Sequence, residues 1–155
     1  MADTSLHESK IGLLVWKTSV FWQTRLRYVL NPYKVSLNEY LILLSLTNLL
    51  KNRSNIYQNE ISQSVGIDIT VTSVTLKSLE KKRFISRRVL NDSRKKIIEI
   101  LKRGEDIFQI IHPLVEKEEE NLFKKLNNET FNFTNSLKLL LGKKIRIKAE
   151  KQNDR

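Results

Sequence analysis

The chain has 155 residues, of which 40% are hydrophobic, and it carries 28 Lys and Arg against 17 Asp and Glu, a formal net charge of +11. The absence of cysteine excludes disulfides, thiolate metal sites and cysteine nucleophiles, and the few glycines and prolines favour long helices. The sequence shows neither a signal-peptide pattern nor an apolar run of membrane-spanning length. We therefore expect a mainly α-helical cytoplasmic protein with no membrane partner.

A first helix is predicted from about Glu8 to Leu30, before Asn31-Pro32-Tyr33, because proline disfavours a helical conformation in the preceding residue. Its apolar residues spread around more than one face, so the helix needs two packing partners. Two tryptophans and a phenylalanine would otherwise leave a large apolar patch, which indicates a dimer interface, with packing inside one chain as the alternative. Ser36 and Glu39 then form a capping-box pattern at the start of an apolar helix that reaches about Leu50.

Two short helices follow, at about 58–65 and 69–82, joined by Gly66-Ile67-Asp68. Short helices connected by three or four residues with a glycine are typical of a helix-turn-helix. Asp68 is a suitable N-cap for the second helix, where its carboxylate also complements the helix dipole. We expect this pair of helices to be the DNA-binding element.

At about 100° per residue, the helix at 69–82 separates into two faces. Leu76 and Leu79 lie on the apolar face with Thr72 and Thr75. Small hydroxyl residues, a methyl-bearing valine and lysines are side chains that suit a major groove. A solvated surface helix would show the same division, so that interpretation stays open. The predicted recognition face consists of Thr70, Ser73, Val74, Lys77 and Lys81.

Residues 84–90 and 95–101 predict a β-hairpin with a turn at 91–94. Residues 68–103 hold eleven Lys and Arg against four Asp and Glu, an excess of seven positive charges. Arg94 at the tip could enter a narrow minor groove, oriented by Asp92, although a solvated charged hairpin is the alternative. The remaining candidate DNA contacts on the hairpin are Arg87, Arg88, Lys95 and Lys96.

Two more helices are predicted at about 104–126 and 130–144, before a charged tail. His112 and Glu116 lie four residues apart, but without cysteine they lack enough companions for a metal site, so we expect no metal and no cofactor. The acidic run Glu116 and 118–120 is interpreted as a solvated face. Neither a glycine-rich phosphate loop nor a catalytic triad occurs, which argues against an enzyme.

The order of these elements resembles the MarR (multiple antibiotic resistance regulator) family over about residues 10–145. The matching stretches are Leu13-Leu-Val-Trp-Lys-Thr-Ser-Val-Phe-Trp-Gln23, Asp68 to Leu79 with the following Glu-Lys-Lys, and the wing pattern of Asp92 and Arg94. The chain departs from the family in a wing about one residue shorter and without prolines. It also has Arg83 in place of the usual glycine and Leu101 in place of the usual threonine.

The resemblance implies one MarR-like domain over 1–155: a mainly α winged helix-turn-helix with a small β-hairpin wing and a helical dimerisation region from both termini. The module would span 36–101, and helices at 8–30 and 104–147 would form the homodimer. The expected function is sequence-specific binding of duplex DNA at a pseudo-palindromic operator, with repression of transcription. A small aromatic or phenolic acid is the expected effector, and its pocket would be lined by Trp16, Lys17, Trp22 and Arg25.

Two other functions fit a chain of this charge. A basic RNA-binding or nucleoid-associated protein would bind nucleic acid without reading its sequence. A pure interaction module would not bind duplex DNA at moderate salt. Substituting Lys77 or Arg94 with alanine distinguishes a nonspecific nucleic-acid-binding protein, which should lose little affinity, from a specific regulator, which should lose its site preference or much of its affinity.

Overall fold

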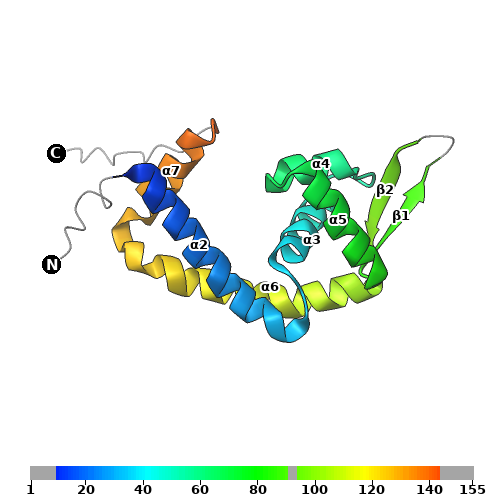
Figure 1. The fold of residues 1–155 in the computed structure, drawn as a ribbon, viewed down its shortest axis with the longest axis horizontal. Helices are drawn as coiled ribbons and strands as arrows, with labels where there is room; N and C mark the ends of the chain where they lie inside the picture. Colours follow the sequence, from blue (N-terminus) through cyan, green and yellow to red (C-terminus); the bar gives the residue numbers. More distant parts are fainter. Residues whose placement is uncertain (1–9, 91–93, 144–155) are drawn as a thin grey trace, which may run out of the picture. The chain divides into compact units, whose positions relative to one another are not determined.

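The computed structural model describes residues 10–90 and 94–143 (Figure 1). The chain forms two compact units, residues 1–119 and residues 120–155. The second unit contains the end of α6, a 3-10 helix and α7. The elements in chain order are α2 (Ile11–Leu30), a 3-10 turn (Asn31–Tyr33), α3 (Leu37–Leu50), α4 (Gln58–Val65), α5 (Ile69–Lys81), β1 (Ile85–Val89), β2 (Lys96–Ile100), α6 (Lys102–Phe123), a second 3-10 helix (Lys124–Glu129) and α7 (Thr130–Leu140).

The core of the first unit lies where α3, α4 and α5 meet the base of the hairpin. Its centre consists of fully buried aliphatic side chains from all three helices. Burying one such side chain contributes about 1.5–3 kcal/mol, so these contacts hold two short helices that would be marginal alone. The core therefore fixes the helix-turn-helix as one body. Its central members are Ile42, Leu43, Leu46, Ile61, Leu76 and Leu79.

The helix starts follow local signals that the sequence predicted. The hydroxyl of Ser36 accepts a hydrogen bond from the amide of Glu39 at 3.1 Å, and the Glu39 carboxylate accepts one from the amide of Ser36 at 2.9 Å. Asp68 accepts a hydrogen bond from the amide of Thr70 at 2.8 Å, which lowers the pKa of its carboxyl group. Gly66 ends α4 with φ +76°, in the left-handed region that favours glycine. The predicted capping box and N-cap are confirmed.

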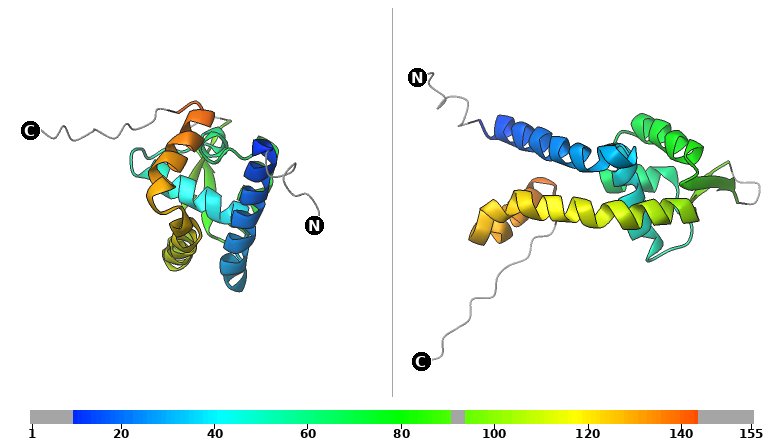
Figure 2. Two further views of the ribbon diagram at one scale, coloured as in Figure 1. Left: turned by 90° about the vertical axis from the view of Figure 1, so that its left-hand side faces the viewer. Right: turned by 90° about the horizontal axis from the view of Figure 1, so that it is seen from below.

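The hairpin pairs β1 with β2 in antiparallel register, with Ile85 opposite Ile100 and Val89 opposite Lys96. Ile97 and Ile98 on β2 are buried, and the amide of Ile98 donates to the carbonyl oxygen of Ile56 at 2.9 Å. The base of the hairpin is thus tied to the segment before α4. Figures 1 and 2 show the rest of the hairpin projecting away from α3, α4 and α5.

The predicted bounds of the last two helices need correction: α7 ends at Leu140 rather than near residue 144, and α6 differs at both ends. Helix α6 begins at Lys102, two residues before the predicted start, and ends at Phe123 rather than near Leu126. A 3-10 helix follows, in which Asn127 is non-helical with φ +44°. Pro113 lies inside α6, which continues through it. The early start of α6 brings Gly104 into the first turn of the helix.

Gly104 is packed against the backbone between α5 and β1. A Cβ at this position would lie within 2.9 Å of the Phe84 carbonyl carbon, and would lie closer still to its oxygen. We therefore expect Gly104→Ala to destabilise the protein by about 2 kcal/mol, because neither backbone can yield without loss of packing. Thermal unfolding followed by circular dichroism measures the effect. Gly12→Ala, at a helical glycine with open space around it, is the control and should not lower the melting temperature. Equal melting temperatures for both variants would contradict the expectation.

The acidic residues in the second half of α6 are not all solvated, contrary to the prediction. The indole N–H of Trp22 donates to Glu119 Oε1 at 2.7 Å, and Arg25 forms an ion pair with Glu118. Both carboxylates thus hold α2 against α6, next to the fully buried Leu26. Within the described residues, no helix combines the length and apolar character needed to cross a membrane.

Candidate nucleic-acid interface

The two faces of α5 differ in exposure as the sequence predicted. Thr72, Leu76 and Leu79 are fully buried, and Thr75 is nearly so. On the other side Val74 is 63% exposed, although it is apolar. Ser73 is half-buried, and Thr70, Lys77 and Lys81 are exposed. All five side chains of the predicted recognition face are therefore accessible to a partner to some degree.

The buried threonines are satisfied inside α5 itself. Thr72 Oγ1 donates to the carbonyl oxygen of Asp68 at 2.9 Å, and Thr75 Oγ1 donates to that of Val71 at 2.8 Å. Hydroxyls bonded one turn back along the helix need no partner elsewhere in the core. Their methyl groups remain free to pack, so the inner face of α5 accepts these polar residues at little energetic cost.

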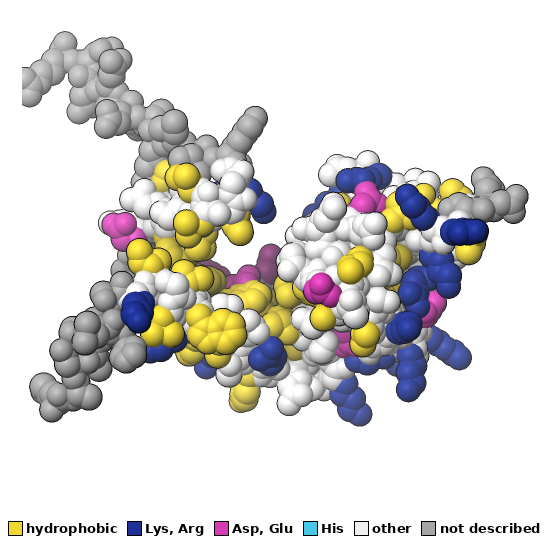
Figure 3. Space-filling view, turned by 45° about the horizontal axis from the view of Figure 1, so that its top comes forward, with side chains coloured by type: hydrophobic (Ala, Val, Ile, Leu, Met, Phe, Trp, Pro, Cys, Tyr) yellow, Lys and Arg dark blue, Asp and Glu magenta, His cyan; other side chains and the backbone are white. Residues whose placement is uncertain are grey.

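Cationic side chains gather at the hairpin end of the first unit, on the right in Figure 3. Arg94, Lys95 and Lys96 are exposed, and with the start of α4 they line a hollow of about 520 Å³. The ammonium group of Lys95 lies 6.0 Å from the centre of the Tyr57 ring. Asp92, which was predicted to orient Arg94, lies outside the described residues.

Two other arginines of the hairpin are already paired with carboxylates. Arg87, whose side chain is only 14% exposed, contacts Glu80 through Nε at 3.1 Å and Nη2 at 2.6 Å. The hydrogen bond from Arg87 lowers the pKa of Glu80. Arg88 is exposed and pairs with Glu99 across the hairpin at 2.7 Å. Arg87 thus joins β1 to α5, and its role as a DNA contact stays a prediction, like that of Arg88.

Lys82 has a role at the end of α5 that the sequence did not predict. Lys82 donates from Nζ to Glu39 and to the carbonyl oxygen of Lys34, both at 2.7 Å, so it bridges α5 to the start of α3. Arg83 takes the left-handed conformation with φ +60°, which explains why a glycine is favourable at this position. The local charge pattern contains no sign of the Lys82 contacts, because Glu39 lies 43 residues before Lys82.

The four residues predicted to line an effector pocket all lie on α2. Trp16 is 66% exposed and Lys17 is also exposed, whereas Trp22 is half-buried. The polar groups of Trp22 and Arg25 are engaged with Glu119 and Glu118. Of the two cations expected to face an effector carboxylate, Arg25 therefore already faces a carboxylate of α6. The effector pocket stays a prediction.

His112 contacts neighbours other than a metal. Its Nδ1 lies 2.9 Å from Tyr40 Oη, its Nε2 lies 3.3 Å from Glu116, and its ring stacks on Phe108 with centroids 4.8 Å apart. Burial, together with the charges of Glu119 and Glu116, raises the pKa of Tyr40. In the described part of the chain, no three His, Asp or Glu side chains come together as a metal site.

Similar proteins share this architecture at low sequence identity. The chain matches no protein-family model. It is 24% identical over 131 residues to the uncharacterised HTH-type transcriptional regulator YdcH of Bacillus subtilis (strain 168). The matched region covers 84% of this chain and 88% of that protein.

Solved structures agree more closely with the fold. A MarR-family transcriptional regulator from Rhodococcus sp. RHA1 superposes with a TM-score of 0.74 at 15% identity, covering 88% of this chain and 95% of that one. MepR of S. aureus, in complex with DNA, has a TM-score of 0.76 at 19% identity, covering 87% and 96%. The resemblance predicted from the sequence is confirmed: the chain has the winged helix-turn-helix fold of the MarR-family transcriptional regulators.

Proposed function

We propose that the chain is a transcription regulator that binds duplex DNA in a sequence-specific manner, through α5 in the major groove and the hairpin beside it. The observation that carries this proposal is the outer face of α5, where Val74 and Lys77 are exposed while the opposite face is buried in the core. An exposed valine can contact thymine methyl groups, and the hydroxyl and ammonium groups beside it can donate to acceptors at base edges. MepR, which has the same fold, was crystallised with DNA.

The binding form in this proposal is a homodimer on a pseudo-palindromic operator. Helix α2 leaves Ile11, Trp16 and Phe21 exposed by 74%, 66% and 51%. Monomeric proteins rarely leave such apolar surface uncovered, and a second copy would cover it. Two-fold symmetry then places the half-sites one or more turns apart, at multiples of about 10 base pairs. As in the sequence-based prediction, dimerisation would involve helices from both termini.

The proposal also includes repression of transcription and a cytoplasmic location. Binding of a small aromatic acid would release the protein from its operator. The proposed activity is binding and not catalysis. Lys17, which is exposed on α2, offers a cation to the carboxylate of such an acid. Calorimetry with a panel of aromatic acids tests this part, and no binding across the panel would overturn it.

Selection of bound fragments from random duplex DNA tests the proposed function. A regulator should enrich a pseudo-palindromic motif, whereas a nonspecific nucleic-acid-binding protein should enrich none. On the selected duplex, we expect Lys77→Ala to weaken binding by about 1–3 kcal/mol, equal to about 5-fold to 150-fold. Arg94→Ala should weaken it and reduce the slope of log affinity against log salt by about 1.

Lys117→Ala is the matched control, since it removes one exposed cation from α6. Binding of this variant should stay within about 2-fold of the unchanged protein, because its charge lies outside the proposed contact surface. Equal losses for all three variants, on selected and unrelated duplexes alike, would contradict sequence readout and favour binding by charge alone.

A further inference from the structure

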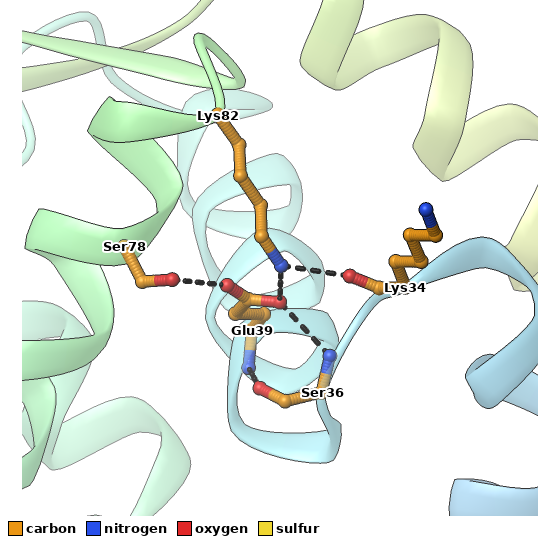
Figure 4. Close-up of polar contacts among 5 residues, drawn as sticks. All are labelled: Lys34, Ser36, Glu39, Ser78 and Lys82. Carbon is orange, nitrogen blue, oxygen red and sulfur yellow. Dashed lines mark hydrogen bonds and ion pairs between the residues drawn. The ribbon is translucent and has the colours of Figure 1, made fainter.

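Glu39 is a buried carboxylate that contacts the recognition helix directly (Figure 4). Its side chain is only 3% exposed, although it lies within the first turn of α3. A capping box requires one contact from this residue, the hydrogen bond to the Ser36 amide. Glu39 makes two further contacts, and both reach α5.

The two carboxylate oxygens are bonded to different turns of α5. Oε1 accepts a hydrogen bond from the hydroxyl of Ser78 at 2.7 Å, and Oε2 accepts one from the ammonium of Lys82 at 2.7 Å. Burial alone would raise the pKa of Glu39, but the bonds from Lys82, Ser36 and Ser78 together lower it. Glu39 is therefore ionised at neutral pH, and its charge is balanced by Lys82.

These contacts lie on the same row of α5 side chains as the exposed Val74. Residues 74, 78 and 82 are spaced four apart, so they follow one ridge along the helix. Val74, Ser78 and Lys82 also line one hollow together with Glu39 and the segment before α3. The carboxylate thus fixes the C-terminal part of a ridge whose N-terminal part belongs to the predicted recognition face.

Small rotations of this ridge matter for base contacts. Side-chain tips lie about 5 Å from a helix axis, so a rotation of about 20° moves them by about 2 Å. A hydrogen bond to a base edge does not survive a displacement of that size. Bonds to two successive turns oppose rotation and sliding of α5 more strongly than one bond could.

We propose that Glu39 is a positioning residue for sequence readout, which sets the rotation of α5 through Ser78 and Lys82. This inference rests on the proposed function, because it assigns Glu39 a role in discriminating between DNA sequences. Glu39 does not touch the DNA in this arrangement. Its effect should therefore appear in the ratio of affinities for the selected operator and for an unrelated duplex.

The decisive variant is Glu39→Gln, which keeps the shape of the side chain and can still cap α3. The amide has no negative charge, so Lys82 loses its ionic partner and only the contact with Ser78 continues to hold α5 as before. We expect the affinity ratio between operator and unrelated duplex to fall about 10-fold, measured at a temperature where circular dichroism shows the variant folded. Expressed as a free energy, the loss of discrimination in the double variant Glu39→Gln/Lys82→Met should be smaller than the sum of the losses in Glu39→Gln and Lys82→Met.

Glu60 offers a matched control in α4. Its carboxylate accepts a hydrogen bond from the Tyr57 amide at 2.9 Å and pairs with Arg53, so it resembles Glu39 in capping and charge but contacts neither Ser78 nor Lys82. Glu60→Gln should change both affinities by the same factor. An equal change in both affinities for Glu39→Gln would overturn the positioning role and leave Glu39 as a helix cap only.

A second measurement needs no DNA. Amide hydrogen exchange in the free protein should become faster across α5 in Glu39→Gln, and should stay unchanged there in Glu60→Gln. If the unchanged protein selects no motif, the proposed function fails, whereas the exchange rates still decide whether Glu39 restrains α5. Unchanged exchange in α5 of Glu39→Gln would overturn the positioning role whatever the DNA experiments show.

Discussion

Val74→Glu should abolish specific DNA binding while leaving the fold intact. Val74 is 63% exposed on the outer face of α5, so the substitution removes little packing. A carboxylate there would be repelled by the nearby phosphates and by base-edge acceptors inside the groove, and it would lose the methyl contact that Val74 offers. We expect the affinity for the selected operator to fall at least about 100-fold, equal to about 2.7 kcal/mol. Fluorescence anisotropy with labelled duplex measures the loss.

Gln109→Glu is the control for charge, because it adds the same negative charge at an exposed position of α6. It should lower the affinity by no more than about 3-fold, through the long-range field alone. Both variants should melt within a few degrees of the unchanged protein. Retention of operator affinity in Val74→Glu would show that α5 does not enter the groove with this face.

Phe21→Asp combined with Trp16→Asp should convert the proposed dimer into monomers. Both side chains lie on α2 and are at least half exposed in the single chain. Covering a large aromatic side chain contributes about 1.5–3 kcal/mol, and burying an unpaired carboxylate in its place adds a penalty of several kcal/mol. The dimer should weaken at least about 1,000-fold, which sedimentation velocity at micromolar concentration detects directly.

Operator affinity should fall with the dimer, because each monomer retains contacts with only one half-site. Val89→Asp is the matched control, since Val89 on β1 is 53% exposed, close to the value for Phe21. This control should remain dimeric. A double variant that still sediments as a dimer would place the interface elsewhere.

The parts of the fold that depend on neighbouring residues could be predicted from the sequence. The capping box of Ser36 and Glu39, the N-cap at Asp68 and the two faces of α5 each result from residues within a turn or two of one another. A sequence reveals such signals because caps lie at a fixed spacing from the helix start and burial repeats with the period of the helix. The helix bounds in the helix-turn-helix accordingly agree within one or two residues.

The roles of individual charges could not be predicted in this way. Lys82 and Arg87 looked equivalent to Lys81 and Lys96 in the sequence, yet each has a carboxylate partner that folding brings to it. Arg25, predicted near an effector, pairs with Glu118, which lies 93 residues further along the chain. Choosing such partners requires the tertiary arrangement of the helices. A charge count therefore overstates how many cations are available to a ligand.

The left-handed conformation of Arg83 was indicated only by the resemblance to the MarR family. A glycine is usual at this position in the family that the sequence resembles, but periodicity and charge alone do not distinguish Arg83 from its cationic neighbours. The backbone conformation reflects the turn between α5 and β1, where the amide of Phe84 donates to the carbonyl oxygen of Leu79 at 3.0 Å. That turn is a local helix end of the Schellman type, but the sequence does not mark it because arginine stands where glycine is favoured.

The hydroxyls of Thr72 and Thr75 are bonded within α5, and the outer side chains of that helix lie outside the hydrophobic core. Substitutions at Val74 or Lys77 therefore have little effect on folding stability, since they disturb no packed neighbour. In the proposed regulator, single substitutions on this outer face would change the preferred operator at little cost in folding stability. Folding stability and sequence preference would thus depend largely on different side chains of α5, with Ser78 and Lys82, which contact Glu39, as the exceptions.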